Sequence, residues 1–171
     1  IGNDDWNINL TQGMNSSHAF NTSDVGTTTD KFLISPQITL YSASILEFWH
    51  KYVFEGNATY YDGAVLEISS DLGQNWQDLG SQMTVGGYNG LLSAGNALGV
   101  REGWGGSNPS YTKVSVDLSS FAGQNVQFRW RFGADSGVGA GDWNIDDIKV
   151  IDPSVCDDND IIFRSSFDII N

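Results

Sequence analysis

"NVQFRWRFG", residues 125–133, alternates apolar and polar side chains more regularly than the rest of the chain. In an extended segment, successive side chains point to opposite faces, so the two kinds of residue separate. The apolar set is Val126, Phe128, Trp130 and Phe132, and the polar set is Gln127, Arg129 and Arg131. This pattern predicts a strand with one face in a core and the other toward water.

Three more stretches alternate in the same way: "SILEFWHKYV" at 44–53, "AVLEISS" at 64–70 and "TKVSVDL" at 112–118. Segments rich in Gly, Asn, Asp and Ser separate the stretches, which is typical of turns, and helical periodicity is nearly absent. About eight short strands spaced in this manner predict an all-β fold, a two-sheet antiparallel jelly-roll sandwich. The glycine-rich residues 80–110 are expected to form a long surface excursion.

With 171 residues, the chain is expected to form one domain over residues 1–151. An acidic carboxy-terminal extension over 152–171, with one possible extra strand, would follow it. Cys156 is the only cysteine, so neither an internal disulfide nor a thiolate zinc site is available. The start at Ile1 fits a fragment or a processed product of a larger secreted precursor.

The net charge of -13 argues against nucleic acid and anionic membrane surfaces as partners and favours divalent cations. No apolar run has the roughly 18 residues that a membrane span needs, so membrane insertion is not expected. Many of the acids are Asp residues in turn-like sequence, where they can act as oxygen ligands or simply as turn formers.

"DWNIDDIKV", residues 142–150, places two adjacent carboxylates inside a predicted strand. Strict alternation puts Asp146 on the same face as Ile148 and Val150, toward the core, and puts Asp147 beside Lys149 on the exposed face. A buried carboxylate needs an arginine, several backbone donors, protonation or a metal ion. The nearby oxygen donors make calcium attractive, although spacing alone favours a hydrogen-bonded structural Asp.

Two other groups of residues are candidates for a site. Oxygen donors near the amino end could join a cation site, although no EF-hand spacing is present and the sequence pattern alone favours turn or strand-cap roles for them. His50, in line with Leu46 and Phe48, is expected to be a core-side histidine with a hydrogen bond to Glu55 or Asp62. The amino-terminal donors are Asp4, Asn21, Asp24 and Asp30.

Six tryptophans raise the possibility of sugar binding. Trp49, Arg129 and Arg131 would form one binding face if their strands are neighbours, and Trp104 falls in turn-rich sequence where it could add to that face. The alternative is that loops or side-chain stems cover these rings. No zinc-protease motif or nucleophile elbow is present, and no spacing singles out a carboxylate pair, so a self-contained hydrolase or lyase is the least favoured hypothesis.

Several longer motifs together resemble one known family. They are "LISPQITL", "LEFWHKYVFEG", "YDGAVLEISSDLGQNWQDLG", "YNGLLSAGNALGVREGWGG" and "VSVDLSSFAGQNVQFRWRFGADSGVGAGDWNIDDIKV". Their order resembles the MAM-like domain of immune inhibitor A-type secreted bacterial peptidases, over residues from about Asp5 to Ile151. The chain is also similar, more distantly, to the cleaved adhesin domains of gingipain-type proteases.

The resemblance implies a noncatalytic, secreted, extracellular jelly-roll domain, commonly stabilised by Ca²⁺, beside a parent catalytic domain. It implies that Asp146 binds the ion with oxygens drawn from Asp4, Asn21, Asp24 and Asp30, and that His50, Glu55 and Asp62 form a polar cluster or second ion site. The expected role is binding of a protein or polysaccharide substrate or surface, or stability of the parent enzyme. A carbohydrate-binding module of a secreted enzyme is the alternative.

Overall fold

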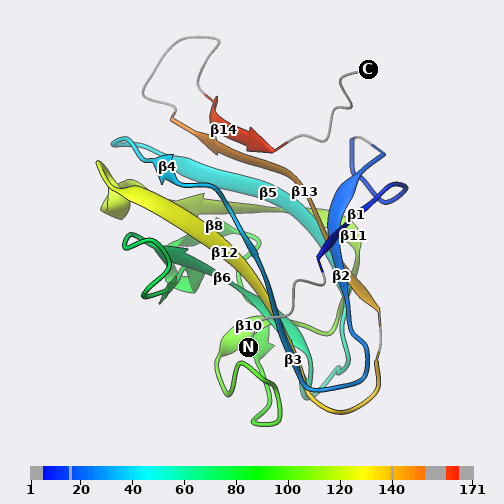
Figure 1. Ribbon diagram of the computed structural model, residues 1–171. Coiled ribbons are helices and arrows are strands. Elements are labelled where there is room, and N and C mark those ends of the chain that lie inside the picture. Colours follow the sequence, from blue (N-terminus) through cyan, green and yellow to red (C-terminus); the bar gives the residue numbers. More distant parts are fainter. Residues whose placement is uncertain (1–5, 16, 140, 153–160, 166–171) are drawn as a thin grey trace.

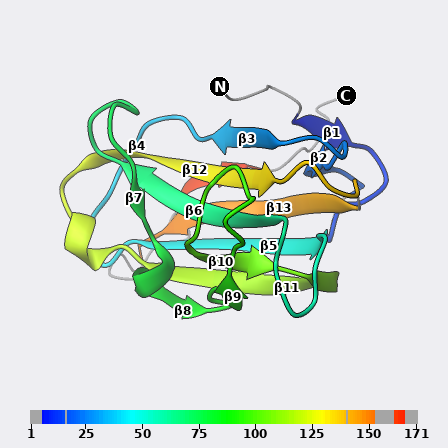
Figure 2. The same cartoon turned by 90° about the horizontal axis from the view of Figure 1, so that it is seen from below.

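The protein is described by a computed structural model that covers residues 6–15, 17–139, 141–152 and 161–165. Two antiparallel sheets pack face to face, as Figure 1 shows edge-on and Figure 2 shows after a quarter turn. The predicted all-β sandwich is confirmed. Within these ranges no helix is long and apolar enough to cross a membrane.

The first sheet contains the strands that carry most of the amino-terminal and carboxy-terminal sequence. Its order is β1 (Asn7–Asn9), β2 (Ala19–Ser23), β13 (Asp142–Ile151), β5 (Ile45–Val53), β11 (Ser107–Asp117) and β8 (Met83–Val85), with β14 (Ile161–Ser165) also paired to β13. One edge of β13 therefore pairs first with β2 and then with β14, while its other edge pairs with β5 along most of its length.

The second sheet is built around the strand that shows the clearest alternation. Its order is β3 (Thr29–Ile34), β12 (Asn125–Ala134), β6 (Gly63–Ser69), β10 (Glu102–Gly105) and β9 (Gly90–Leu91); β4 (Ile38–Thr39) pairs with β12, and β7 (Gln77–Asp78) pairs with β6. Two short 3-10 helices, η1 (Gly80–Gln82) and η2 (Ser119–Phe121), lie in the connections.

The core lies between the sheets and is rich in aromatic rings. Phe48 of β5 meets Trp130 of β12 edge-on, with ring centroids 5.6 Å apart, which is a favoured geometry for aromatic pairs. His50 is on the same face of β5 and is buried, as the alternation predicts. The inward and outward faces of β5, of β12 and of β11 from Thr112 onward agree with the expected period of two.

The excursion expected at residues 80–110 is not confined to the surface. Residues 102–105 form β10, which pairs with β6 and carries Trp104 into the core, where only 2% of its surface stays exposed. A Cβ atom on Gly103 would lie 2.9 Å from the Ala64 carbonyl oxygen, so this close strand approach requires glycine. The high glycine content of residues 80–110 predicts a loop, but at Gly103 the glycine allows β10 to pack closely against β6.

The strand β13 contains a bulge that the alternation did not predict. Ladder pairing with β5 shifts register between Asp146 and Lys149, and Asp147 has a φ of 50°, in the left-handed region. Before the bulge Trp143 and Ile145 face the core, and after it Ile148 does so. Asp146 therefore lies on the outer face, and the predicted core-facing orientation is wrong.

The strand β14 is the only part of the carboxy-terminal extension that the structure describes beyond Asp152. Its pairs with β13 run from Ile148↔Ser165 to Ile151↔Ile161. Cys156 lies outside the described residues. The division into a domain over 1–151 and an extension over 152–171 stays a prediction.

Candidate metal site

Three loops bring carboxylates together at one end of the sandwich. Glu55 and Asp62 lie on the connection between β5 and β6, and Asp135 follows β12. One carboxylate oxygen of each residue lies within 4.8 Å of the other two. Asp24, on the connection from β2 to β3, is close enough to Asp62 for their side chains to interact. The cluster thus joins loops from both sheets.

Backbone amides fix the orientation of these side chains. The two oxygens of Asp62 accept hydrogen bonds from the amides of Glu55 and Asp135, both at 3.2 Å. Glu55 Oε2 accepts from the Val138 amide at 3.0 Å, which ties the loop before β6 to the loop before β13. The carboxylates are therefore held in place by the loops that they connect.

The electrostatics of the cluster disfavour a full set of negative charges. Asp62 is 1% exposed, and this burial, together with the charge of Asp24, raises the pKa of the Asp62 carboxyl from 3.8 to about 7. Two backbone hydrogen bonds act in the opposite direction and do not cancel the effect. A cation bound among these oxygens would favour the ionised form of Asp62 and so offset the cost of burying its charge.

The donor set fits calcium. Ca²⁺ binds six to eight oxygens at about 2.3–2.6 Å, so ligands on opposite sides of one ion lie about 5 Å apart, and the spacing of the three carboxylates agrees with this. A Cβ atom on Gly137 would lie 2.7 Å from Asp135 Oδ1 and 2.8 Å from Glu55 Oε2. The loop can wrap this closely around the carboxylates because residue 137 is glycine.

The residues predicted to form a site around Asp146 are not assembled there. Asn21 is the nearest of them on the sheet, and its side chain donates to Asn144 Oδ1 at 3.1 Å. Asp30 accepts two hydrogen bonds from Arg131, and Asp24 belongs to the loop cluster. Asp4 lies outside the described residues.

Asp146 is nevertheless a buried carboxylate, 3% exposed, and burial raises its pKa. Its oxygens accept from the amides of Met14 and Asp147, each at 2.8 Å. The neighbouring Asp147 accepts a further bond from the Asn15 side chain. Of the partners considered for Asp146, backbone donors are the ones present, and they attach the segment 10–15 to the outer face of the first sheet.

The predicted cluster of His50, Glu55 and Asp62 separates into two places. His50 lies in the aromatic core against Trp104, with ring centroids 4.8 Å apart, and its Nδ1 accepts from Trp143 Nε1 at 3.4 Å. Burial lowers the pKa of His50 to about 3, so the ring is neutral. The expected hydrogen bond from His50 to Glu55 or Asp62 is replaced by the one from Trp143.

The predicted ligand face is also not assembled. Trp49 lies on the outer face of the first sheet, in register with Lys113 and Asp146, whereas Arg129 and Arg131 lie on the outer face of the second. Trp104 is in the core, where its Nε1 donates to the carbonyls of Gly86 and Gly87. For Trp49, Arg129 and Arg131 the alternation predicts the outward face correctly, but it does not predict the sheet to which each strand belongs.

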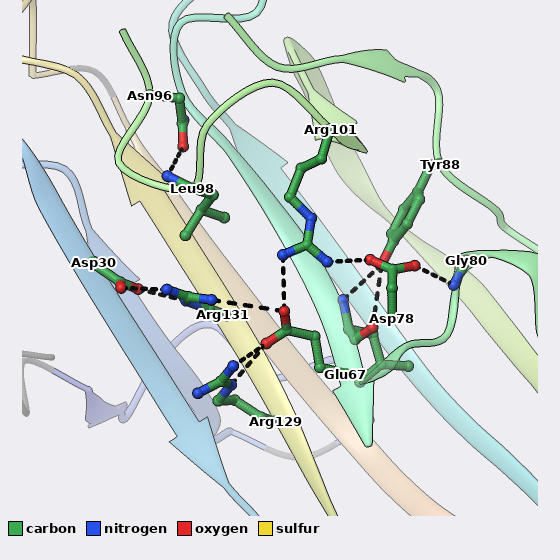
Figure 3. A network of polar contacts seen from close by, with 11 residues as sticks. Asp30, Glu67, Asp78, Gly80, Tyr88, Asn96, Leu98, Arg101, Arg129 and Arg131 are labelled. Carbon is green, nitrogen blue, oxygen red and sulfur yellow. Dashed lines mark hydrogen bonds and ion pairs between the residues drawn. The ribbon is translucent and has the colours of Figure 1, made fainter. Parts of the chain in front are cut away.

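An ion-pair network covers the outer face of the second sheet (Figure 3). Glu67, buried on β6, accepts from Arg101 at 2.8 Å and from Arg129 at 2.7 Å, and Arg131 approaches it to 3.6 Å. Arg131 also makes the two-point contact with Asp30, and Arg101 pairs with Asp78. Through Arg101, the network attaches the segment before β10 to the sheet. Arg129 and Arg131, which were expected to bind a ligand, are instead paired with Glu67 and Asp30.

Sequence reasoning missed three of these residues. Asp135 stands in the turn "GADSGVGAGD" and was assigned only to a turn, and Glu67 was one polar residue of an alternating strand. Trp76 stacks on Arg129, with the guanidinium carbon 4.3 Å from the ring centroid. Asp135, Glu67 and Trp76 meet the residues they contact only after strands that are distant in the sequence have paired.

Comparison with known proteins agrees with a β-sandwich domain. A family model for Reelin subrepeat B matches residues 9–151. A solved structure of the Spr0440 glycoside hydrolase domain, Endo-D from Streptococcus pneumoniae R6, has a TM-score of 0.53 and 19% identity; the match covers 84% of this chain and 19% of that one. At this identity the likeness concerns the fold alone. No curated protein sequence matches the chain significantly.

Two further solved structures are similar at lower scores. TmCBM61 in complex with beta-1,4-galactotriose has a TM-score of 0.47 and 13% identity, over 84% of this chain and 74% of that one. The K3 cleaved adhesin domain of Lys-gingipain from Porphyromonas gingivalis W83 has a TM-score of 0.47 and 18% identity, over 82% and 76%.

Proposed function

The chain belongs to the Reelin subrepeat B family, and we propose that it is a noncatalytic, calcium-stabilised accessory domain of a secreted bacterial peptidase. The observation that carries the calcium proposal is the cluster of Glu55, Asp62 and Asp135 carboxylates within 4.8 Å of one another. The peptidase parent is proposed from the resemblance of the sequence motifs to MAM-like domains of the immune inhibitor A type.

In this proposal the three carboxylates hold the ion, and bound calcium supplies the positive charge that lets buried Asp62 ionise. The ligands then join the loops at 55–62 and 135–138, with Asp24 of the β2–β3 connection beside them. An ion that binds only the folded chain stabilises it by mass action. This stabilisation suits a secreted domain whose single cysteine cannot form an internal disulfide.

Thermal unfolding tests the calcium proposal. At a free calcium concentration about 100 times Kd, a gain of about 2.7 kcal/mol would raise Tm by roughly 5–10 °C over the value in EGTA. Asp62→Asn should abolish most of this rise, whereas Glu102→Gln, at an exposed position of β10, should keep it. Equal Tm values for the wild type with calcium and with EGTA would refute the proposal.

Binding, rather than catalysis, is proposed for the whole domain. His50 is neutral in the core, and the arginines of the second sheet are held by Glu67 and Asp30, so neither set offers an open reactive centre. Binding of a protein or polysaccharide substrate would place the parent enzyme on its target. The alternative function, carbohydrate binding, is favoured by a groove on the first sheet that joins apolar surface to polar groups such as Lys51.

A further inference from the structure

A groove of about 300 Å³ opens on the outer face of the first sheet, where β5 ends and β13 begins. Its polar and apolar walls come from the amino-terminal segment and three strands: Gln12, Lys51, Val53, Pro109, Asp142 and Asn144. This size is at the low end of the range for small-molecule pockets, about 300–1,000 Å³. We call it the Lys51 groove.

One wall of the Lys51 groove is held in place by three contacts. The Gln12 carbonyl accepts from the Tyr111 hydroxyl at 2.6 Å, and Gln12 Oε1 accepts from Lys51 Nζ. The Lys51 ammonium also lies 4.9 Å from the centroid of the Tyr111 ring. Segment 10–15 is attached further along by Asp146. The groove therefore exists before a ligand arrives, which lowers the entropic cost of binding.

The floor of the groove is the Asn144 amide. Asn144 is 4% exposed and lies in register between Lys51 of β5 and Asn21 of β2. Its Oδ1 accepts from Asn21 Nδ2 at 3.1 Å, which fixes the amide and leaves Nδ2 as the group that can donate to a ligand. Asn21, expected at a metal site, thus acts as a positioning residue for Asn144.

The groove combines a few donors and acceptors with a lining that is mostly apolar. Lys51 Nζ and Asn144 Nδ2 are donors, while Gln12 Oε1 and the carboxylate of exposed Asp142 are acceptors. Each hydroxyl of a ligand can donate one hydrogen bond and accept two, so adjacent hydroxyls match such an alternating set. Val53, 40% exposed, and Pro109 can cover carbon-bound hydrogens on one side of the ligand.

We propose that the Lys51 groove binds a neutral sugar residue. A wholly apolar ligand would remove water from the Asp142 carboxylate and from the Lys51 ammonium, for which Gln12 Oε1 satisfies only one donor. A polyanion would meet Asp142 and a chain of net charge -13. A sugar residue supplies hydroxyls for the charged groups and a carbon-hydrogen face for Val53. This assignment rests on the proposed binding function but not on calcium.

Chemical-shift mapping tests the sugar site on the ¹⁵N-labelled full chain with calcium. Galactose, glucose, mannose and N-acetylglucosamine are each titrated to millimolar concentration as probes. At least one should shift the amides of Lys51, Val53, Asp142 and Asn144. Lys51→Met and exposed Asp142→Ala should each weaken that binding at least tenfold, which is about 1.4 kcal/mol, while the matched exposed-acid control Glu102→Gln should leave it unchanged.

Three outcomes would overturn the proposal: no groove shift with any of the four sugars, shifts confined to the Trp76 and Arg129 face, or unchanged affinity in both groove variants. The spectrum of each variant confirms that it is folded, so loss of binding is separable from unfolding. Sugar binding without any calcium-dependent rise in Tm would refute the calcium proposal alone. A calcium-dependent rise without sugar binding would refute the groove assignment alone.

Discussion

Asp146 of β13 pairs with Trp49 of β5 in the first sheet, and the carboxylate consequently faces outward beneath the segment 10–15. Asp146 and Trp49 share the outer face because they form a regular ladder pair. The bulge at Asp147 comes after this pair and turns the next residue, Ile148, toward the core. The charge in the middle of an apolar strand is thus a contact point for the amino-terminal segment.

Changing the carboxylate should loosen that segment. Asp146→Asn retains one acceptor oxygen and replaces the other by an NH₂ group that faces a backbone donor, so we expect a loss of about 1–3 kcal/mol in the free energy of unfolding. Amide hydrogen exchange at Met14 should become faster. The Tm rise with calcium should persist; its disappearance would place the ion at Asp146 instead of Asp62.

The bulge itself can be tested at Asp147. Its φ of 50° is costly for a β-branched residue, so Asp147→Val should destabilise the domain by roughly 1–2 kcal/mol in urea unfolding. Asp147→Gly is the matched control, because glycine adopts this conformation readily and both changes remove the contact with Asn15. Equal stability of the two variants would contradict the left-handed conformation at this position.

The network on the second sheet predicts unequal effects for two acids. Glu67→Gln removes the charge that faces Arg101, Arg129 and Arg131, and breaking such a buried pair costs about 3–5 kcal/mol. Asp78→Asn, at a more exposed pair with Arg101 alone, should cost about 1 kcal/mol or less. Urea unfolding of both variants measures the difference, and a larger loss at Asp78 would contradict the central place of Glu67.

The stabilisation by calcium should depend on pH. Because the Asp62 pKa is raised to about 7 in the fold, above its ordinary value of 3.8, this group destabilises the metal-free fold as pH rises from about 4 to about 7. Calcium must displace its proton below about pH 7, so the Tm difference between calcium and EGTA should be larger at pH 7.5 than at pH 5. The same difference at both pH values would show that Asp62 is not a ligand.

The strands were predictable because their side chains alternate with a period of two, as Phe128 and Trp130 against Arg129 illustrate. The orientation of Asp146 was not, because a bulge changes the period at one residue. A signal was present in the sequence: Ile145 and Ile148 are three positions apart, so strict alternation cannot bury both.

The candidate site was predictable only in part. Glu55 and Asp62 lie seven positions apart in the sequence, and the connection between β5 and β6 brings them together. Asp135 joins them because β12 pairs with β6 over seven residues and ends beside Asp62, a long-range contact that no local pattern encodes. Asp24 was assigned to the ion beside Asp146 and lies instead beside Asp62.

Glu55, Asp62 and Asp135 are proposed to hold a calcium ion that joins the loops at one end of the sandwich. Crystals grown with calcium, measured at a wavelength where calcium scatters anomalously, would locate the ion directly. The account predicts an anomalous peak among the three carboxylates, with ligand oxygens at about 2.3–2.6 Å. A calcium-containing crystal with no peak there, or with its peak at Asp146, would contradict it.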